Sequence, residues 1–385
     1  MPLFLVHSLA LLVEGLKTSR LPRLAAAGAL LGLGAHSYPS FRMAPLILPL
    51  YLVAEIGPDP KAWKRAAKGL TLFIAMAALL AAPMALHYLH HPEQLNNPRR
   101  IVSVFSPKVD RALVPSFLRR NLVATLLMFH LHGDDNWRHN LAGAPLLDPL
   151  TGALLLLGIV RIAWRAWPAR GGAPAGPPGS APAAALLFPW IPVMLLPNLL
   201  SVQGVPHALR SCGVLPALVL LAGIGLDLVH EALARVAGAR AALAATMIAW
   251  FFLGGLTYHR YFTTWGEDPR VFAEHDGAFR AAARLLLAAP PGVGRLLVAN
   301  GTGFPAYGQP AEVEPYLFEM RARPPVVIGP HDGGLLALAG RPALVALVRR
   351  DERILETIRA LNPSAPVAEV AAPGLSPDSP VYRVN

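Results

Sequence analysis

The sequence predicts an all-α polytopic membrane protein of about seven or eight membrane segments, followed by a small extracytoplasmic α/β domain. Of its 385 residues, 54% are hydrophobic and 15% are charged, whereas soluble globular chains carry about 25% charged residues. Apolar runs alternate with basic loops up to residue 258, and short β-branched runs alternate with helical segments after it. We therefore expect a transmembrane domain over residues 1–258 and an extracytoplasmic α/β domain over residues 259–385.

The basic residues of the chain mostly flank its apolar runs. The net charge is +11 at pH 7. Basic residues recur at alternate loops, as the positive-inside rule and contact with anionic membrane lipid would require. No basic stripe interleaved with aromatic residues lies on a polar domain, so we expect no nucleic-acid partner. The pattern predicts a multi-pass protein of the cell membrane.

Three apolar runs open the transmembrane domain. Met1–Val13 spans about 20 Å, less than the roughly 30 Å hydrocarbon core, and is predicted to be the end of a helix whose beginning is missing. Leu24–Ala54 is divided into two arms by a polar kink at residues 36–42, and basic residues on both flanks place this kink outside. Leu70–Tyr88 is long enough to cross the membrane.

An outer loop is expected over residues 90–149, in which apolar residues recur at helical spacing from Val114 to Phe129. This pattern fits either an amphipathic helix along the membrane interface or an ordinary packed helix. A flexible, cytoplasmic Pro/Gly linker is predicted over residues 168–183. The remaining apolar runs are expected to be membrane helices: Leu150–Trp167, Leu186–Leu200, Val214–Val229 and Ala241–Tyr258.

The C-terminal part begins with an aromatic stretch, Tyr261–Trp265, that is typical of a membrane-interface belt. Phe272–Ala289 is predicted to be one helix, and short β-branched runs then alternate with two more helices. The predicted strands are Arg295–Ala299, Pro325–Ile328, Ala343–Val348 and Val381–Val384, and the two helices are Glu312–Arg323 and Asp351–Leu361.

The polar stretch Gly133–Asp148 is the main candidate for a functional site. It places Asp134 and Asp135 beside Arg138 and His139. Ionisable groups at a membrane cost free energy, so where they occur they often mark a functional site. Either carboxylate could act as the general base that removes a proton from an acceptor hydroxyl. The alternative is a solvated loop in which Asp134 caps a turn.

A metal site is a second interpretation of the same loop, with His130, His132, Asp134 and His139 as ligands. His-x-His spacing puts both rings on one face of an extended strand. However, His130 and His132 lie at the end of a helical pattern, where this spacing separates the two side chains. We therefore expect no metal, and we expect no cofactor.

Arginines are the candidate ligands for a lipid phosphate, because the planar guanidinium forms paired charge-assisted hydrogen bonds. Arg138, together with His139, could hold such a group, or it could instead extend to lipid headgroups. Arg42 at the kink and Arg210 in the outer turn lie on the same predicted side of the membrane. We expect the three arginines to converge on one phosphate. Three polar residues near them in the chain complete the candidate set: Tyr38, Asn140 and His207.

Four segments within residues 24–279 carry a family resemblance. They are LGLGAHSYPSFRMAPL, RHNLAGAPLLDPLTGALLLLGI, VPHALRSCGVLPAL and YFTTWGEDPRVFAEH. In this order they resemble the later membrane part of glycosyltransferase family 39-like proteins, which are similar to dolichyl-phosphate-mannose protein mannosyltransferases and bacterial aminoarabinose transferases. The resemblance implies a GT-C-type helical fold, a polyprenyl-phosphate sugar donor and transfer on the extracytoplasmic side, to a protein or glycolipid acceptor.

One difference from the family concerns catalysis. The resemblance implies a catalytic acidic residue in the first outer loop, and this chain has no such loop before Leu24. We therefore expect a fragment that binds the lipid-linked sugar without transferring it, and the catalytic residue stays unassigned, with Asp134 and Asp135 as candidates. The alternative function is a non-catalytic membrane protein that binds or moves a lipid-linked glycan.

Overall fold

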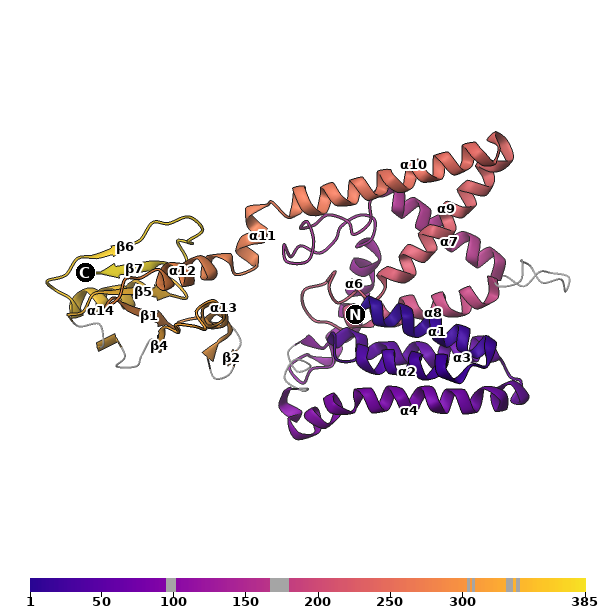
Figure 1. Cartoon of the computed structure of the whole chain (residues 1–385), viewed down its shortest axis with the longest axis horizontal. Helices are drawn as coiled ribbons and strands as arrows, with labels where there is room; N and C mark the ends of the chain where they lie inside the picture. The colour runs from indigo at the N-terminus through magenta and orange to yellow at the C-terminus, as the bar shows by residue number, and fades with distance from the viewer. Residues whose placement is uncertain (95–101, 167–179, 303–304, 307–308, 330–334, 337–339) are drawn as a thin grey trace. The chain divides into compact units, whose positions relative to one another are not determined.

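The computed structural model describes residues 1–94, 102–166, 180–302, 305–306, 309–329, 335–336 and 340–385. The chain forms two compact units, the helical unit Met1–Trp265 and the α/β unit Gly266–Asn385 (Figure 1). The two units meet after Trp265, seven residues beyond the predicted boundary at residue 258. The reason is that α10 continues into a π-helical turn, η3 (His259–Trp265).

The helical unit is built from helices joined mostly by short loops. In its first part these are α1 (Pro2–Thr18), α2 (Leu21–Gly34), the 3-10 helix η1 (Pro39–Leu46), α3 (Ile47–Ile56) and α4 (Pro60–His90). They are followed by η2 (Arg111–Leu113), α6 (Val114–Leu127), α7 (Pro149–Ala166), α8 (Ser180–Leu199), α9 (Leu215–Ala237) and α10 (Ala239–Tyr258).

Four helical stretches among the described residues are long and apolar enough to cross a membrane. They are Pro39–Ile56, Pro60–His90, Leu215–Ala237 and Ala239–Trp265. Shorter apolar helices cover Leu21–Gly34, Pro149–Trp164 and Ala184–Leu199. These helices confirm the predicted helical architecture and indicate membrane association.

Several predicted boundaries in the helical unit are confirmed. The loop predicted over residues 90–149 begins where α4 ends at His90 and stops where α7 begins at Pro149. The predicted kink, residues 36–42, covers the turn after α2 and the first residues of η1, and the ring of Phe41 occupies the space that a Cβ on Gly34 would need. The predicted linker lies mostly outside the described residues, and its end, residues 180–183, forms the first turn of α8 instead. Proline tolerates this position, since the first turn of a helix needs no backbone donor.

The helices pack closely through glycines. Helix α2 packs on α4 at Gly28, and α7 packs on α9 at Gly158 and Gly225. A Cβ on any of these glycines would overlap a backbone carbonyl of the facing helix: Phe73 for Gly28, Leu221 for Gly158 and Leu154 for Gly225. Small residues that let backbones approach are typical of helix contacts in membranes, where apolar burial does not drive association.

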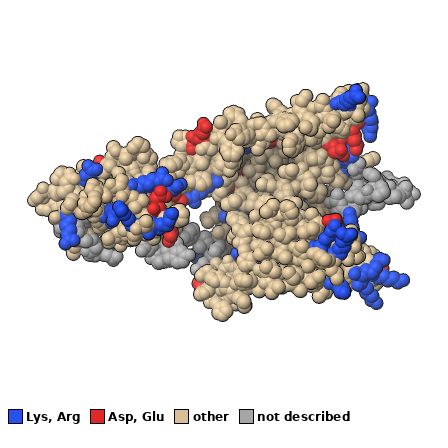
Figure 2. All heavy atoms as spheres, viewed as in Figure 1, with Lys and Arg blue, Asp and Glu red and all other residues tan. Residues whose placement is uncertain are grey.

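Charge separates the two ends of the helical unit. The turns that join α1 to α2, α3 to α4 and α9 to α10 lie at one end (Figure 1). Lys and Arg side chains gather there (Figure 2). We call this end, which carries Lys17, Arg23, Lys68, Arg235 and Arg240, the basic end. The loops before α7 and α9, with α6 and η1, lie at the opposite end, which we call the loop end (Figure 1).

The α/β unit is a five-stranded sheet in the order β4-β1-β5-β7-β6. Strands β4, β1 and β5 are parallel, whereas β7 is antiparallel to both β5 and β6. The strands are β1 (Gly294–Val298), β4 (Val326–Ile328), β5 (Ala343–Leu347), β6 (Val367–Glu369) and β7 (Val381–Val384), and β2 (Pro305–Ala306) and β3 (Gln309–Pro310) form a separate pair. The four predicted strands are confirmed, and the short β6 was not predicted.

Helices cover both faces of this sheet. Helix α14 (Glu352–Leu361) packs on one face, while α12 (Gly277–Leu287) and α13 (Glu314–Glu319) pack on the other. The prediction of one helix over Phe272–Ala289 is wrong, because α11 (Pro269–Glu274) ends before Asp276, which adopts a left-handed conformation with φ 60°.

Candidate functional site

Two loops at the loop end of the helical unit form the candidate site. The first follows α6 and closes on itself, because Gly133 N–H donates to Gly143 O and Gly143 N–H donates to the carbonyl of Asp134. Gly143 has a φ of 72°, which favours glycine. The second loop joins α8 to α9 and carries His207 and Arg210.

Asp134 lies at the junction of these loops with only 4% of its surface exposed. Its Oδ1 accepts from the N–H of Asn136 at 2.9 Å, and its Oδ2 accepts from the N–H of Ala208 at 2.8 Å. The predicted turn-capping role is therefore confirmed, whereas the prediction that this residue is solvated is wrong. The buried carboxylate ties the second loop to the first.

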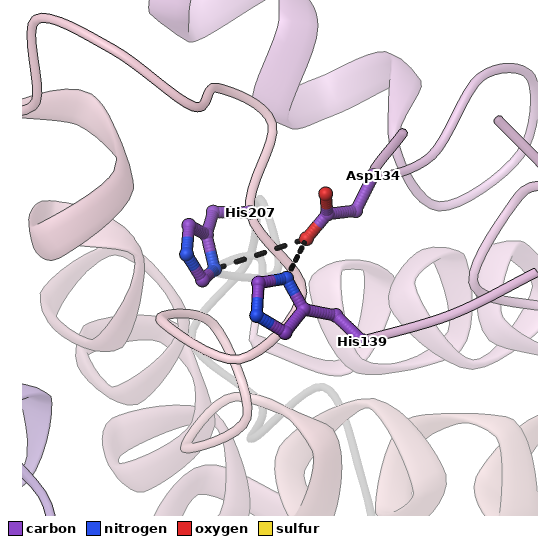
Figure 3. A group of neighbouring side chains, drawn as sticks. All are labelled: Asp134, His139 and His207. Carbon is purple, nitrogen blue, oxygen red and sulfur yellow. Dashed lines mark hydrogen bonds and ion pairs between the residues drawn. The ribbon is translucent and has the colours of Figure 1, made fainter. Parts of the chain in front are cut away.

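His139 forms the closest side-chain contact of Asp134, with 2.8 Å between Nδ1 and Oδ2 (Figure 3). An ionised carboxylate only accepts hydrogen bonds, so Nδ1 carries the ring hydrogen in the neutral imidazole. Nε2 of His139 then keeps its lone pair, and it has no hydrogen-bond partner among the described residues. This arrangement leaves a basic nitrogen oriented by a buried carboxylate.

His207 stacks on His139 with ring centroids 4.3 Å apart, and its Nδ1 lies 3.8 Å from Oδ2 of Asp134 (Figure 3). This Nδ1 accepts from the N–H of Arg210 at 3.3 Å, so the ring hydrogen lies on Nε2. Burial, followed by the charges of Arg210 and His139, lowers the pKa of His207 to about 4, against the opposing effect of Asp134. His207 is therefore a neutral ring at pH 7.

Arg210 places a positive charge beside this cluster. Its Nη1 donates to Gln203 O at 2.9 Å, and burial lowers the pKa of the guanidinium while Tyr38 and Asp134 raise it. Burial raises the pKa of the Tyr38 hydroxyl, and the charge of Arg210 opposes this shift. Five predicted residues, Tyr38, Asp134, His139, His207 and Arg210, are thus neighbours in one site.

The other predicted residues lie outside this cluster. The side chain of Asp135 is 74% exposed and pairs with His132 at 3.2 Å. Asn140 closes its own loop by donating to Ala144 O at 2.7 Å, and Arg138 is exposed. Arg42 donates from Nη2 to the Tyr88 hydroxyl at 2.9 Å, and its buried Nε has no partner in the described part of the chain. Convergence of Arg42, Arg138 and Arg210 on one phosphate stays a prediction.

The cluster also has the donor set of a metal site. One ligand atom each from Asp134, His139 and His207 lies within 4.8 Å of the others. Two imidazoles and a carboxylate suit Zn²⁺ or another transition metal, but binding through Nδ1 of His139 would first require loss of its hydrogen. The sequence interpretation shared Asp134 and His139 with this cluster but included His130 and His132 in place of His207. His130 contacts Gly152 O at 3.3 Å, and His132 pairs with Asp135.

A cavity of about 150 Å³ lies beside His139. Polar and aromatic residues from two distant segments line it, among them Asp148, Arg260, Tyr261 and Trp265. Trp265 Nε1 donates to Trp137 O at 2.8 Å, which attaches η3 to the first loop. The sequence interpretation treated Tyr261–Trp265 as an interface belt only, since nothing in the sequence links it to a loop more than 100 residues away.

A second, larger cavity of about 470 Å³ follows α6 to the loop that carries His207. Val123, Ala124 and Leu127 line it together with Arg119, Arg120 and Pro206. Helix α6 is confirmed, and its packed face is polar: buried Asn121 donates to the carbonyls of Leu199 and Ser201. Apolar side chains of α6 are consequently left exposed: Leu122, Val123, Leu126 and Leu127.

Comparison with protein-family models, curated proteins and solved structures finds no match to this chain.

Proposed function

We propose that the helical unit is a membrane glycosyltransferase that takes a sugar from a polyprenyl phosphate and transfers it to a hydroxyl on the extracytoplasmic side. Two observations on His139 carry the proposal: its Nε2 has no partner among the described residues while Nδ1 binds buried Asp134, and the residue lines a cavity. In this proposal α1, α2, α7 and α8 cross the membrane beside the four longer stretches. The basic end then lies in the cytoplasm and the loop end outside.

His139, rather than a carboxylate, is the base in this mechanism. Both oxygens of Asp134 already accept hydrogen bonds, so the carboxylate orients His139 instead of taking the proton itself. The acceptor hydroxyl gives its proton to Nε2 as its oxygen bonds to the anomeric carbon of the sugar. The bond from that carbon to the phosphate oxygen breaks, and polyprenyl phosphate leaves with the electron pair. Asp134 stabilises the imidazolium that forms.

Arg210 and Arg42 are the proposed ligands of the departing phosphate. Arg210 adjoins the histidines, and Arg42 keeps a buried Nε–H without a partner. Positive groups at the site of developing charge stabilise the transition state more than the bound donor.

The apolar groove along α6 accounts for the lipid part of the donor. Its floor is formed by Val123, Ala124 and Leu127, and Arg119 and Arg120 line it as well. A prenyl chain seated there would bury apolar surface, while its phosphate extends toward Pro206 and the neighbouring His207.

A transfer assay with the purified chain, a polyprenyl-phosphate sugar and a mixed pool of acceptors tests the proposal. From the sequence alone we expect binding without transfer, because no catalytic carboxylate is assigned; with His139 as the base we propose instead that the wild-type chain turns over. His139→Gln should lose about 10²–10⁴-fold, the range that a general base contributes. His90→Gln is the control, since this exposed histidine at the end of α4 lines neither the cavity beside His139 nor the groove along α6. Turnover that persists in His139→Gln would remove the assigned base. No turnover by a wild-type chain that still binds the donor would favour the non-catalytic alternative.

A further inference from the structure

Another cavity of the helical unit lies at the basic end, away from the histidine site. It measures about 550 Å³ and is lined by the end of α1, the start of α2, the end of α3 and the first turns of α4. Sugar transfer at the loop end makes no use of it. The residues that line this cavity therefore need an explanation other than sugar transfer.

Positive charge predominates in this basic pocket. Lys17, Arg65 and Lys68 line it, against a single carboxylate, Glu55. Arg65 also approaches Asp59, at 3.9 Å, whereas Lys17 and Lys68 form no ion pair with any residue that the structure describes. Two ammonium groups are thus available to an anion.

The floor of the basic pocket is apolar and shaped by small residues. Gly15 and Gly69 both face the side chain of Leu24, which occupies the space that a Cβ would need. Ser19 at the rim has a φ of 52°, which turns the chain sharply between α1 and α2. An occupant therefore meets apolar surface below and cations at the rim.

We propose that this pocket binds the headgroup of an anionic phospholipid, with the phosphate at Lys17 and Lys68. A phosphate is the anion that a membrane supplies at this depth, and basic pockets between helices on one side of a membrane suit such headgroups. The apolar floor fits the glycerol and the first acyl carbons, which a free phosphate lacks. The site is independent of the proposed transfer reaction.

Native mass spectrometry of the purified chain tests the proposal by titration with phosphatidylglycerol. Phosphatidylcholine provides the zwitterionic comparison, and glycerol 1-phosphate provides the same phosphate without acyl chains. We expect phosphatidylglycerol to bind at least tenfold more tightly than either. The double variant Lys17→Gln with Lys68→Gln should weaken it about 30-fold, since a lysine near a membrane surface contributes about fivefold.

Two control variants separate the pocket from the general charge of the basic end. Lys61→Gln with Lys64→Gln removes two lysines of α4 that do not line the pocket, and should change binding less than about threefold. Ala66→Trp, at the wall, should block binding with all charges kept, whereas exposed Ala67→Trp should not. Equal losses in both lysine pairs, or equal binding of glycerol 1-phosphate, would overturn the proposal.

Discussion

The two ends of the helical unit carry charge in opposite ways. At the basic end the side chains of Arg65 and Arg235 are both 78% exposed, and such charges orient a protein in a membrane at little cost. At the loop end the side chain of Asp134 is 6% exposed and that of His139 is 12% exposed. Buried charge is costly unless it is paired. In the proposed function, the first set orients the chain in the membrane and the second set carries out the chemistry.

Arg161 shows that burial alone does not identify a site. Its side chain is 5% exposed, and it pairs with Glu231 at 2.6 Å and Asp227 at 3.4 Å. These carboxylates belong to α9, so the network joins α7 to α9 and neutralises the arginine. His139 differs in the kind of atom that lacks a partner among the described residues. Its Nε2 carries a lone pair that can accept a proton, whereas the buried Nη1 of Arg161 can only donate. The loop end is therefore distinguished by a basic nitrogen, Nε2 of His139, that has no hydrogen-bond partner among the described residues, and not by burial alone.

The difference between the basic end and the loop end depends on close helix packing, which keeps the two ends of the bundle apart. Gly225→Leu should break this packing. This glycine of α9 lies against the backbone of α7 at Leu154, so a side chain forces the helices apart. We expect a loss of about 3 kcal/mol or more in unfolding free energy, measured by thermal unfolding in detergent. Gly223→Leu, on the same helix with no atom within 4 Å of an added Cβ, should be nearly neutral. Equal stability of the two variants would contradict the packing described.

Arg210→Gln should sharpen the chemical difference between the ends. Removal of a charge-assisted contact to phosphate should weaken polyprenyl-phosphate binding about tenfold. Exposed Arg111→Gln, a variant at the same end, should change it less than about twofold. Binding measured by tryptophan fluorescence suffices for this test. Unchanged affinity in Arg210→Gln would remove this residue from the phosphate site.

His207 should make stability depend on pH. Its pKa is about 4 in the folded chain against 6.5 ordinarily, so between these values the unfolded chain binds a proton that the folded chain does not. The free energy of unfolding should therefore fall as the pH decreases from about 6.5 toward 4. His207→Asn keeps an acceptor for the N–H of Arg210 and should flatten the slope of Tm against pH, whereas exposed His132→Asn should leave it unchanged. A slope that persists in His207→Asn would exclude this origin.

Much of the fold could be predicted because its signals are local. Apolar runs, β-branched runs and basic loops predicted where α4 ends, where α7 begins and where four strands of the sheet lie. The break before α12 was missed because it depends on one residue, Asp276, in a left-handed conformation. The exposed apolar face of α6 agrees with the amphipathic interface helix that was one of the two interpretations of this segment. Its polar packed face was not predicted, since buried Asn121 binds carbonyls of a distant segment.

The sequence predicted which residues belong to the candidate site better than it predicted the role of each residue. Asp134 and His139 belong to one short stretch, which the sequence already marked as unusual. The role of each residue depends on contacts across the chain, since the donor from Ala208 to Asp134 spans 74 residues. In the proposed mechanism, that contact and the neighbouring His207 make Asp134 the support of a histidine base instead of the base itself. No local pattern contains this information.

Sidedness is the most direct test of the difference between the two ends. The chain has one cysteine, Cys212, so single cysteines can be introduced on a Cys212→Ser background and labelled in intact cells with a membrane-impermeant maleimide. We expect Asp135→Cys, exposed at the loop end, to react from outside, and Lys61→Cys at the basic end to react only after the membrane is opened. Labelling of Lys61→Cys but not of Asp135→Cys in intact cells would contradict an extracytoplasmic site.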